Sequence, residues 1–243
     1  MKFYVGIHQP ALAKHFDRAF ISINRLWGRK RPVICGEWIL DSGAFHEIEM
    51  FGDYRHDPAL YASEVNRLAR LNPGLIAAVS QDWMCEGFIL DKTGLAITDH
   101  QRLTIERYDA LAAKVRGVYL MPVLQGYAPQ SYVAHIDQYG DRLALGAYVG
   151  VGSLCKRNGD MRKIEAVIRT IKQARPDLQL HGFGLKLTAL RSGEVREGLA
   201  SADSLAWSWS ARRQGRDANN WREAHRFVRR VETMPVQLAL RLA

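Results

Sequence analysis

Residues 37–45 read Glu37-Trp38-Ile39-Leu40-Asp41-Ser42-Gly43-Ala44-Phe45, a short apolar run that ends in a carboxylate and a Ser-Gly turn. Loops at the carboxyl ends of parallel strands carry the chemistry of α/β proteins, so this run predicts a strand that presents Asp41 to a site. Gly43 has no side chain and lets backbone N–H groups approach a bound group closely. A simpler interpretation stays open, in which Asp41 caps a helix or forms a turn.

A second aspartate has a similar setting, in Ala202-Asp203-Ser204-Leu205-Ala206-Trp207-Ser208-Trp209. The apolar residues after Asp203 predict another strand, at 204–207. Two aspartates beside short strands suit a nucleophile and an acid/base partner for chemistry at a sugar carbon. Trp207 and Trp209 are two positions apart, so on an extended segment they would face one side and either stack on a base or pack in the core.

Strands and helices alternate along the whole chain. Apolar runs predict strands at 3–6, 38–41, 75–80, 118–124, 143–149, 178–180 and 204–207. Apolar residues at helical spacing predict helices at 11–26, 58–71, 99–115, 129–139, 161–174, 193–199 and 217–231. The alternation is typical of parallel βα units, and no G-x-G-x-x-G follows the first strand, which favours an α/β fold of the (β/α)8 TIM-like barrel type over a doubly wound sheet. We expect one domain over residues 1–243, with 234–242 as a candidate for the eighth unit.

The composition is that of a globular protein with an excess of basic residues. Of 243 residues 24% are charged, and 34 Lys and Arg against 25 Asp and Glu give a formal net charge of +9, which favours a polyanionic partner. The cysteines Cys35, Cys85 and Cys155 form no C-x-x-C pair, so we expect reduced thiols and no metal site. With no signal peptide and no membrane-spanning apolar run in the sequence, we expect a cytoplasmic location.

Five short motifs occur in order between residues 37 and 215: Asp41-Ser42-Gly43-Ala44-Phe45, Leu124-Gln125-Gly126, Val149-Gly150-Val151-Gly152-Ser153-Leu154, Gly182-Phe183-Gly184, and Asp203 followed by Arg212-Arg213-Gln214-Gly215. They resemble the D-S-G-G-F/Y, V-Q-G, V-G-G-L, G-V-G and aspartate-plus-R-N-G motifs of the tRNA-guanine transglycosylase superfamily. Each motif is weak alone, but five in the family's order are a specific signal.

Two departures from the tRNA enzymes narrow the resemblance. Those enzymes carry a zinc site of three cysteines and a histidine after the R-N-G segment, whereas no cysteine follows Cys155 here, and this chain is much shorter. It looks more like the DNA-modifying branch, which exchanges guanine in DNA for a 7-deazaguanine base and occurs in bacterial modification clusters and phages. The resemblance implies a compact barrel without the zinc-binding subdomain, no cofactor, and a host cytoplasm if a phage encodes the protein.

The resemblance also implies roles for particular residues. Asp203 would be the nucleophile that attacks C1′ of the target nucleotide, and Asp41 the general acid/base that protonates the departing guanine and deprotonates the incoming base. Asp82 would accept from N1–H and the exocyclic amine of a guanine-like base, and a strand-end cap is the simpler interpretation. Gln125 and Gly152 would donate to the base carbonyl, with the assignment between Gly150 and Ser153 open by about one residue. The base-binding set is Asp82, Gln125, Gly150, Gly152, Ser153 and Ser42.

Arginines near the end of the chain are candidates for nucleic-acid binding. Arg222, Arg226 and Arg229 form one stripe of a predicted helix, and a basic segment precedes it. A solvated helix face is the simpler interpretation, and phosphate anchoring is the functional one. The candidates are Arg212, Arg213, Arg216, Arg222 and Arg226.

Together these features predict a DNA-guanine transglycosylase that inserts a 7-deazaguanine base, such as preQ0, at a flipped-out guanine nucleotide. Accessory modification proteins could be needed to open the duplex. Three alternatives stay open: a tRNA-guanine transglycosylase without zinc, a noncatalytic nucleic-acid-binding subunit that keeps the barrel, and a barrel glycosidase acting on free nucleosides or sugars.

Overall fold

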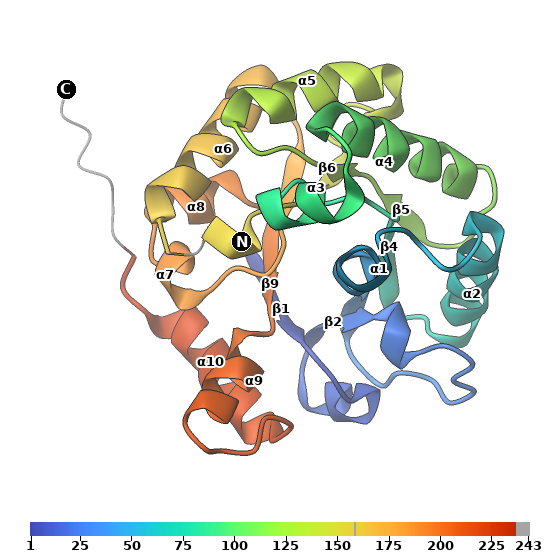
Figure 1. Cartoon of the computed structure of the whole chain (residues 1–243). Helices are drawn as coiled ribbons and strands as arrows, with labels where there is room; N and C mark the ends of the chain where they lie inside the picture. Colours follow the sequence, from blue (N-terminus) through green and yellow to red (C-terminus); the bar gives the residue numbers. More distant parts are fainter. Residues whose placement is uncertain (158, 237–243) are drawn as a thin grey trace.

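The computed structural model describes residues 1–157 and 159–236, and their strands form a barrel that helices surround (Figure 1). Every strand pairing is parallel, and the order around the sheet is β5-β4-β3-β2-β1-β9-β8-β7-β6. The strands are β1 (Lys2–Gly6), β2 (Arg18–Ser22), β3 (Glu37–Asp41), β4 (Leu75–Val79), β5 (Tyr119–Met121), β6 (Val123–Leu124), β7 (Tyr148–Val151), β8 (Gln179–Gly182) and β9 (Ser201–Ser204).

The two edges of this sheet are joined by the chain itself. β5 and β6 stand at opposite ends of the strand order, yet only Pro122 separates them in sequence. Met121 C=O accepts from Ser80 N–H on the β4 side (2.9 Å), and Pro122 C=O accepts from Gly150 N–H on the β7 side (2.9 Å). Proline has no N–H to donate, which accounts for the break in the strand at this point. β5 and β6 thus act as one strand, and the predicted (β/α)8 barrel is confirmed.

The helices lie outside the barrel, and three of them have the predicted bounds. Pro58 and Pro129 begin α2 and α5 at positions where a missing N–H costs nothing, and Asp57 caps α2 by accepting from Ala59 N–H at 2.6 Å. The helices are α1 (Ala44–Phe51), α2 (Pro58–Leu71), α3 (Gly87–Thr93), α4 (Ile97–Ala112), α5 (Pro129–Tyr139), α6 (Met161–Ala174), α7 (Leu187–Leu190), α8 (Gly193–Gly198), α9 (Ala206–Arg213) and α10 (Trp221–Thr233), with 3-10 turns at η1 (Pro10–His15), η2 (Ile23–Arg25), η3 (Gly140–Arg142) and η4 (Cys155–Arg157).

The predicted helix at 11–26 is wrong, and the strand inside it completes the barrel. This segment forms η1, β2 and η2, and β2 bonds to β1 and β3. Ala19 and Ile21 are buried against the surrounding helices, while Phe20 packs inside the barrel, so the alternation is that of a strand. Because β2 fills the eighth position, residues 234–242 are not needed for it. Residues 237–242 of that prediction lie outside the described part of the chain.

The strand predicted at 204–207 is displaced toward the N-terminus, and the strand predicted at 143–149 begins later, at Tyr148. β9 ends at Ser204, so Asp203 lies within the strand rather than before it. Trp207 and Trp209 belong to α9 and do not share an extended face. Trp207 is buried and donates from Nε1 to Gly6 C=O (2.8 Å), whereas Trp209 is 52% exposed.

Two layers of apolar side chains hold the barrel. Tyr4, Ile39 and Val79 pack inside it, and a larger layer fills the space between the strands and the helices. Side chains alternate along each strand, so the residue two positions after an inward-facing one also faces inward. Asp41 follows Ile39 in this way, which brings its carboxylate to the inner rim at the carboxyl ends of the strands.

Shortening a buried side chain of β2 tests the place of this strand in the barrel. Ile21 is fully buried, so we expect Ile21→Ala to lower the free energy of unfolding by about 2–5 kcal/mol. Ile76 on β4 is 37% exposed, and Ile76→Ala should cost less than about 1 kcal/mol. Denaturant unfolding measures both values. Equal losses in the two variants would contradict the assignment of 18–22 as a barrel strand.

Candidate active site

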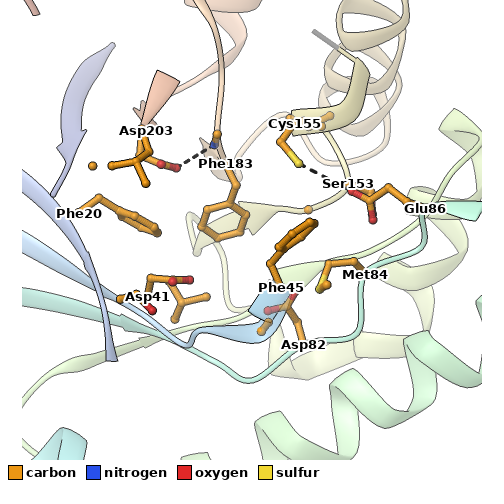
Figure 2. A pocket seen from close by; sticks show the side chains of 18 of the residues that line it. Phe20, Asp41, Phe45, Asp82, Met84, Glu86, Ser153, Cys155, Phe183 and Asp203 are labelled. Atoms are coloured by element: carbon orange, nitrogen blue, oxygen red, sulfur yellow. Dashed lines mark hydrogen bonds between the residues drawn. The ribbon is translucent and has the colours of Figure 1, made fainter. Parts of the chain in front are cut away.

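A pocket of about 350 Å³ opens at the carboxyl ends of the strands and gathers the carboxylates of Asp41, Asp82 and Asp203. Figure 2 shows aromatic rings, among them Phe45 and Phe183, lying among these carboxylates. Active sites of barrel enzymes are found at this end of the strands. The structure therefore places the two aspartates singled out in the sequence in one cavity, although 162 positions separate them.

Asp203 is held by one of its two carboxylate oxygens. It is 5% exposed, and its Oδ1 accepts from Gly184 N–H at 3.0 Å and lies 3.3 Å from His181 Nε2. His181 Nδ1 in turn lies 2.7 Å from Ser201 Oγ and 3.2 Å from the Tyr148 hydroxyl. This chain of contacts orients the carboxylate and leaves Oδ2 without a hydrogen bond among the described residues, in a side chain that lines the pocket.

Asp41 ends β3 and faces Ser22, its register partner on β2. Burial, and after it the charge of Asp203, raise the pKa of Asp41 to about 6, while hydrogen bonds from Ser22 and from the backbone of Gly43 and Ser42 oppose the shift. Gly43, with φ of 75°, is the N-cap of α1, so Asp41 does not cap that helix. The carboxylate of Asp41 accepts instead from the backbone of Ser42 and Gly43 in the turn that follows β3. A carboxyl with this pKa can both give and take a proton near neutral pH.

Asp82 follows β4 and is 6% exposed. Burial raises its pKa to about 7; the hydrogen bond from Gln125 lowers the pKa, and the charges of Asp41 and Glu86 raise it. Gln125 Nε2 donates to Asp82 Oδ2 at 2.5 Å. The hydroxyl of Tyr54 fixes the Asp82 backbone, because it donates to Asp82 C=O (2.9 Å) and accepts from Asp82 N–H (2.8 Å).

Ser153 links the polar groups of the pocket wall. Its Oγ accepts from Cys85 N–H and lies 2.9 Å from both Glu86 Oε2 and Gln125 Oε1, to one of which it can donate its single proton. Its φ of 54° is left-handed, a conformation that non-glycine residues adopt mainly where surrounding contacts hold them. The wall around Gln125 is thus built by several mutually bonded side chains.

The N–H of Gly152, a predicted donor to the base carbonyl, donates in this structure to Leu124 C=O at 2.9 Å in the β6–β7 ladder. Gly152 still lines the pocket, and a Cβ there would collide with the Gln125 side chain. The N–H of Ser153, one residue on, has no acceptor among the described residues. Gly152 therefore provides space, and Ser153 is the better donor within this loop.

Gly150 and Ser42 do not line the pocket. Gly150 lies under Phe183, whose ring occupies the space that a Cβ would need. Ser42 is buried and its hydroxyl hydrogen-bonds the Asp82 carboxylate, lowering the pKa of that group. Both residues support pocket side chains from behind.

Sequence reasoning missed several groups of the pocket. Phe45 belongs to the motif at 41–45, and Glu86 lies four residues after Asp82. His181 could have been found from alternation, because it lies two positions before Phe183. His8, two residues after β1, also lines the pocket, and burial, Arg25 and Arg212 lower its pKa.

Three of the arginines predicted to bind nucleic acid already have partners. Arg216 Nη1 lies 3.2 Å from Glu223 Oε2, and Arg226 pairs with the other oxygen of the same carboxylate. The guanidinium of Arg222 lies 4.9 Å from the centre of the Trp221 ring. None of these arginines lines the pocket.

Arg212 and Arg213 lie at the end of α9, the helix that follows Asp203. Arg213 lies over the exposed ring of Trp209, 4.8 Å from its centre. Arg212 makes no ion pair among the described residues, and its charge acts on His8 in the pocket wall. Of the five predicted arginines, Arg212 is thus the one that the structure links to the pocket.

No group of three His, Cys, Asp or Glu side chains in the described residues could hold a metal ion. Burial raises the pKa of the thiols of Cys35, Cys85 and Cys155, to about 11 for Cys35 and about 12 for Cys155, so all three are protonated at neutral pH. None of the described helices is long and apolar enough to cross a membrane.

A parallel barrel with three carboxylates converging at the carboxyl ends of its strands belongs to the class of (β/α) barrels built for acid/base and nucleophilic chemistry. The model of the DpdA family, described as DeoxyPurine in DNA protein A, matches residues 1–220. The chain therefore belongs to this family, and the predicted membership of the DNA-modifying branch is confirmed. No curated protein is similar enough to be reported as a relative.

The raised pKa of Asp82 predicts a pH dependence of stability. A carboxyl whose pKa is higher in the folded state favours folding below its unfolded value, near 4, and loses that contribution as pH rises through about 7. From pH 4 to pH 8 the free energy of unfolding of the native protein should therefore fall relative to that of Asp82→Asn, by on the order of a few kcal/mol. Denaturant titrations across this range measure it, with exposed Asp91→Asn as the control. A difference that stays constant with pH would count against the buried, protonatable carboxyl.

Proposed function

We propose that the protein is a DNA-guanine transglycosylase, which exchanges guanine in DNA for a 7-deazaguanine base through a covalent aspartyl-glycosyl intermediate. The family assignment supports a transglycosylase-type enzyme with DNA as its substrate. The observation that carries the mechanism is the pairing of Asp203, held by one oxygen only, with Asp41, whose pKa of about 6 suits proton transfer. Both face one pocket.

In the first step Asp203 Oδ2 attacks C1′ of the target nucleotide. A C–O bond forms, the C1′–N9 bond breaks, and its electron pair leaves with guanine while Asp41 supplies a proton to the departing base. In the second step Asp41 takes the proton of the incoming base, whose nitrogen attacks C1′ and releases Asp203. Two displacements at C1′ give net retention, and no redox group is consumed.

Recognition of the guanine-like edge falls to Asp82 and Gln125. An ionised Asp82 accepts from N1–H and the exocyclic amine, and a Gln125 N–H and the backbone N–H of Ser153 are the donors available to the base carbonyl. A base without these groups would leave the buried carboxylate of Asp82 unpaired, so the pocket would discriminate strongly against such a base. Phe45 and Phe183 offer ring faces for stacking in the same pocket.

An exchange assay tests this function. We expect purified protein to transfer a labelled 7-deazaguanine base into duplex or single-stranded DNA and not into tRNA, and to form a protein–DNA adduct that survives denaturation. Asp203→Ala should abolish the adduct and lower exchange at least about a thousandfold, because the nucleophile is removed. Exposed Asp91→Ala is the matched control.

Label that enters only tRNA would refute the DNA assignment and keep the chemistry. An Asp203→Ala variant that still exchanges bases would refute the nucleophile.

Gly152→Ala tests the space at the base edge. The added methyl would displace the Gln125 side chain, so we expect kcat/KM for the incoming base to fall by about a hundredfold, as misplacement of a positioning group commonly does. Gly159→Ala, at a position with open space around it, should leave the value unchanged. Equal activity of the two variants would contradict a base-binding role for this wall.

A further inference from the structure

A second cavity lies beside the active-site pocket and shares two wall residues with it. Its volume is about 370 Å³, within the range of ~300–1,000 Å³ usual for small-ligand sites. Glu86 and Ser153 line both cavities, and the new one is otherwise bounded by Glu49 of α1, by the start of α3, by η4 and by the loop after β6. No step of the proposed exchange uses it.

Two exposed aromatic rings, each paired with a cation, form this cavity. Phe88 is 42% exposed, and Lys156 Nζ lies 5.2 Å from the centre of its ring. Tyr127 is 51% exposed, and the guanidinium of Arg157 lies 4.4 Å from its ring. Exposed aromatic side chains beside basic ones are the usual platform for single-stranded nucleic acid, since bases stack and phosphates are neutralised.

The cavity is fixed to the active site by direct contacts. Arg157 Nε donates to Ser153 C=O at 2.9 Å, so the cation over Tyr127 is tied to the wall that holds Gln125. Lys156 Nζ lies 5.0 Å from the ring of Phe45, which lines the active-site pocket. The rings of Phe45 and Phe88 are 6.3 Å apart, and together they bridge the two cavities.

We infer that this second cavity binds the nucleotide next to the target guanine on the same DNA strand. The inference rests on the proposed function and adds which part of the DNA substrate, beyond the target guanine, the protein binds. When the target nucleotide leaves the base stack, its neighbour loses a stacking partner, and Phe88 or Tyr127 supplies a replacement. Lys156 and Arg157 are placed to neutralise the intervening phosphate, and the carboxylate of Glu49 at the rim can accept from a base amino group.

Oligonucleotides with one missing base provide the test. The substrate is DNA with a single target guanine, compared with the same DNA carrying an abasic site 5′ or 3′ of that guanine. Phe88→Ala and Tyr127→Ala remove the two rings. Phe51→Ala is the matched control, because Phe51 is also exposed (49%), also has a cation over its ring, Arg55 at 4.1 Å, and lines neither cavity.

On intact DNA we expect Phe88→Ala or Tyr127→Ala to lower kcat/KM for DNA by about tenfold or more, the usual loss for one base–aromatic stack. On DNA that lacks the neighbouring base on one side of the target guanine, kcat/KM of the native protein should fall by a similar factor. The kcat/KM of the variant should not fall any further on this DNA. This non-additivity is the signature of a direct contact. The KM for the free base should be unchanged, which separates the effect from misfolding.

The inference is overturned if both variants act on intact DNA within about twofold of Phe51→Ala, or if their loss is the same with and without the neighbouring base. Binding of the same oligonucleotides in single-stranded form, followed by fluorescence anisotropy, should show the same pattern. If the native protein exchanges no base, the proposed function fails, and the anisotropy comparison still decides on the cavity.

Discussion

The burial of two carboxylates, Asp41 and Asp203, in one small pocket and the repulsion between their charges govern the chemistry of this barrel. Asp41 and Asp203 belong to β3 and β9, and only β1 and β2 separate these strands in the sheet. Alternation along the strands turns both carboxylates inward, where few water molecules can solvate them. Burial and the charge of Asp203 raise the pKa of Asp41 to about 6, even though Ser22 and the backbone of Ser42 and Gly43 donate hydrogen bonds to its carboxylate. In the proposed function this pKa suits Asp41 for the transfer of protons, while His181 and Gly184 orient the carboxylate of Asp203.

Much of the fold was predictable from sequence because local signals agreed with it. The helices at 58–71, 129–139 and 161–174 have apolar stripes, and two of them begin with proline, so their bounds match the structure. The segment at 11–26 failed because its apolar spacing suits a helix as well as turns around a short strand. β2 is defined by its neighbours β1 and β3, and those contacts are absent from a local window.

The candidate site, like the fold, was predictable from sequence only where local signals define it. Asp41, Asp82 and Asp203 could be selected because each lies beside a predicted strand, and the order of the motifs supported Asp41 and Asp203 against the simpler interpretation as caps or turn residues. The N–H of Gly152 is bonded to Leu124 C=O, so Ser153 is the next donor along the loop, and only the register of β6 and β7 reveals this. Tyr148 acts through a chain of contacts between three strands, with His181 and Ser201 between it and Asp203, so no spacing in sequence could indicate it.

Ser153 shows how the two cavities become one recognition surface. A left-handed serine costs on the order of 1–3 kcal/mol and persists only where surrounding contacts offset that cost. Here the hydroxyl contacts Cys85 N–H, Glu86 and Gln125, and the carbonyl accepts from Arg157. Those contacts connect the N–H of Ser153, the donor that we propose for the base carbonyl, to the cation above Tyr127. Because the wall is assembled before any ligand arrives, little ordering remains to be done when a nucleotide enters. In the proposed exchange, binding free energy is then available to hold the flipped base against Asp203 and Asp41.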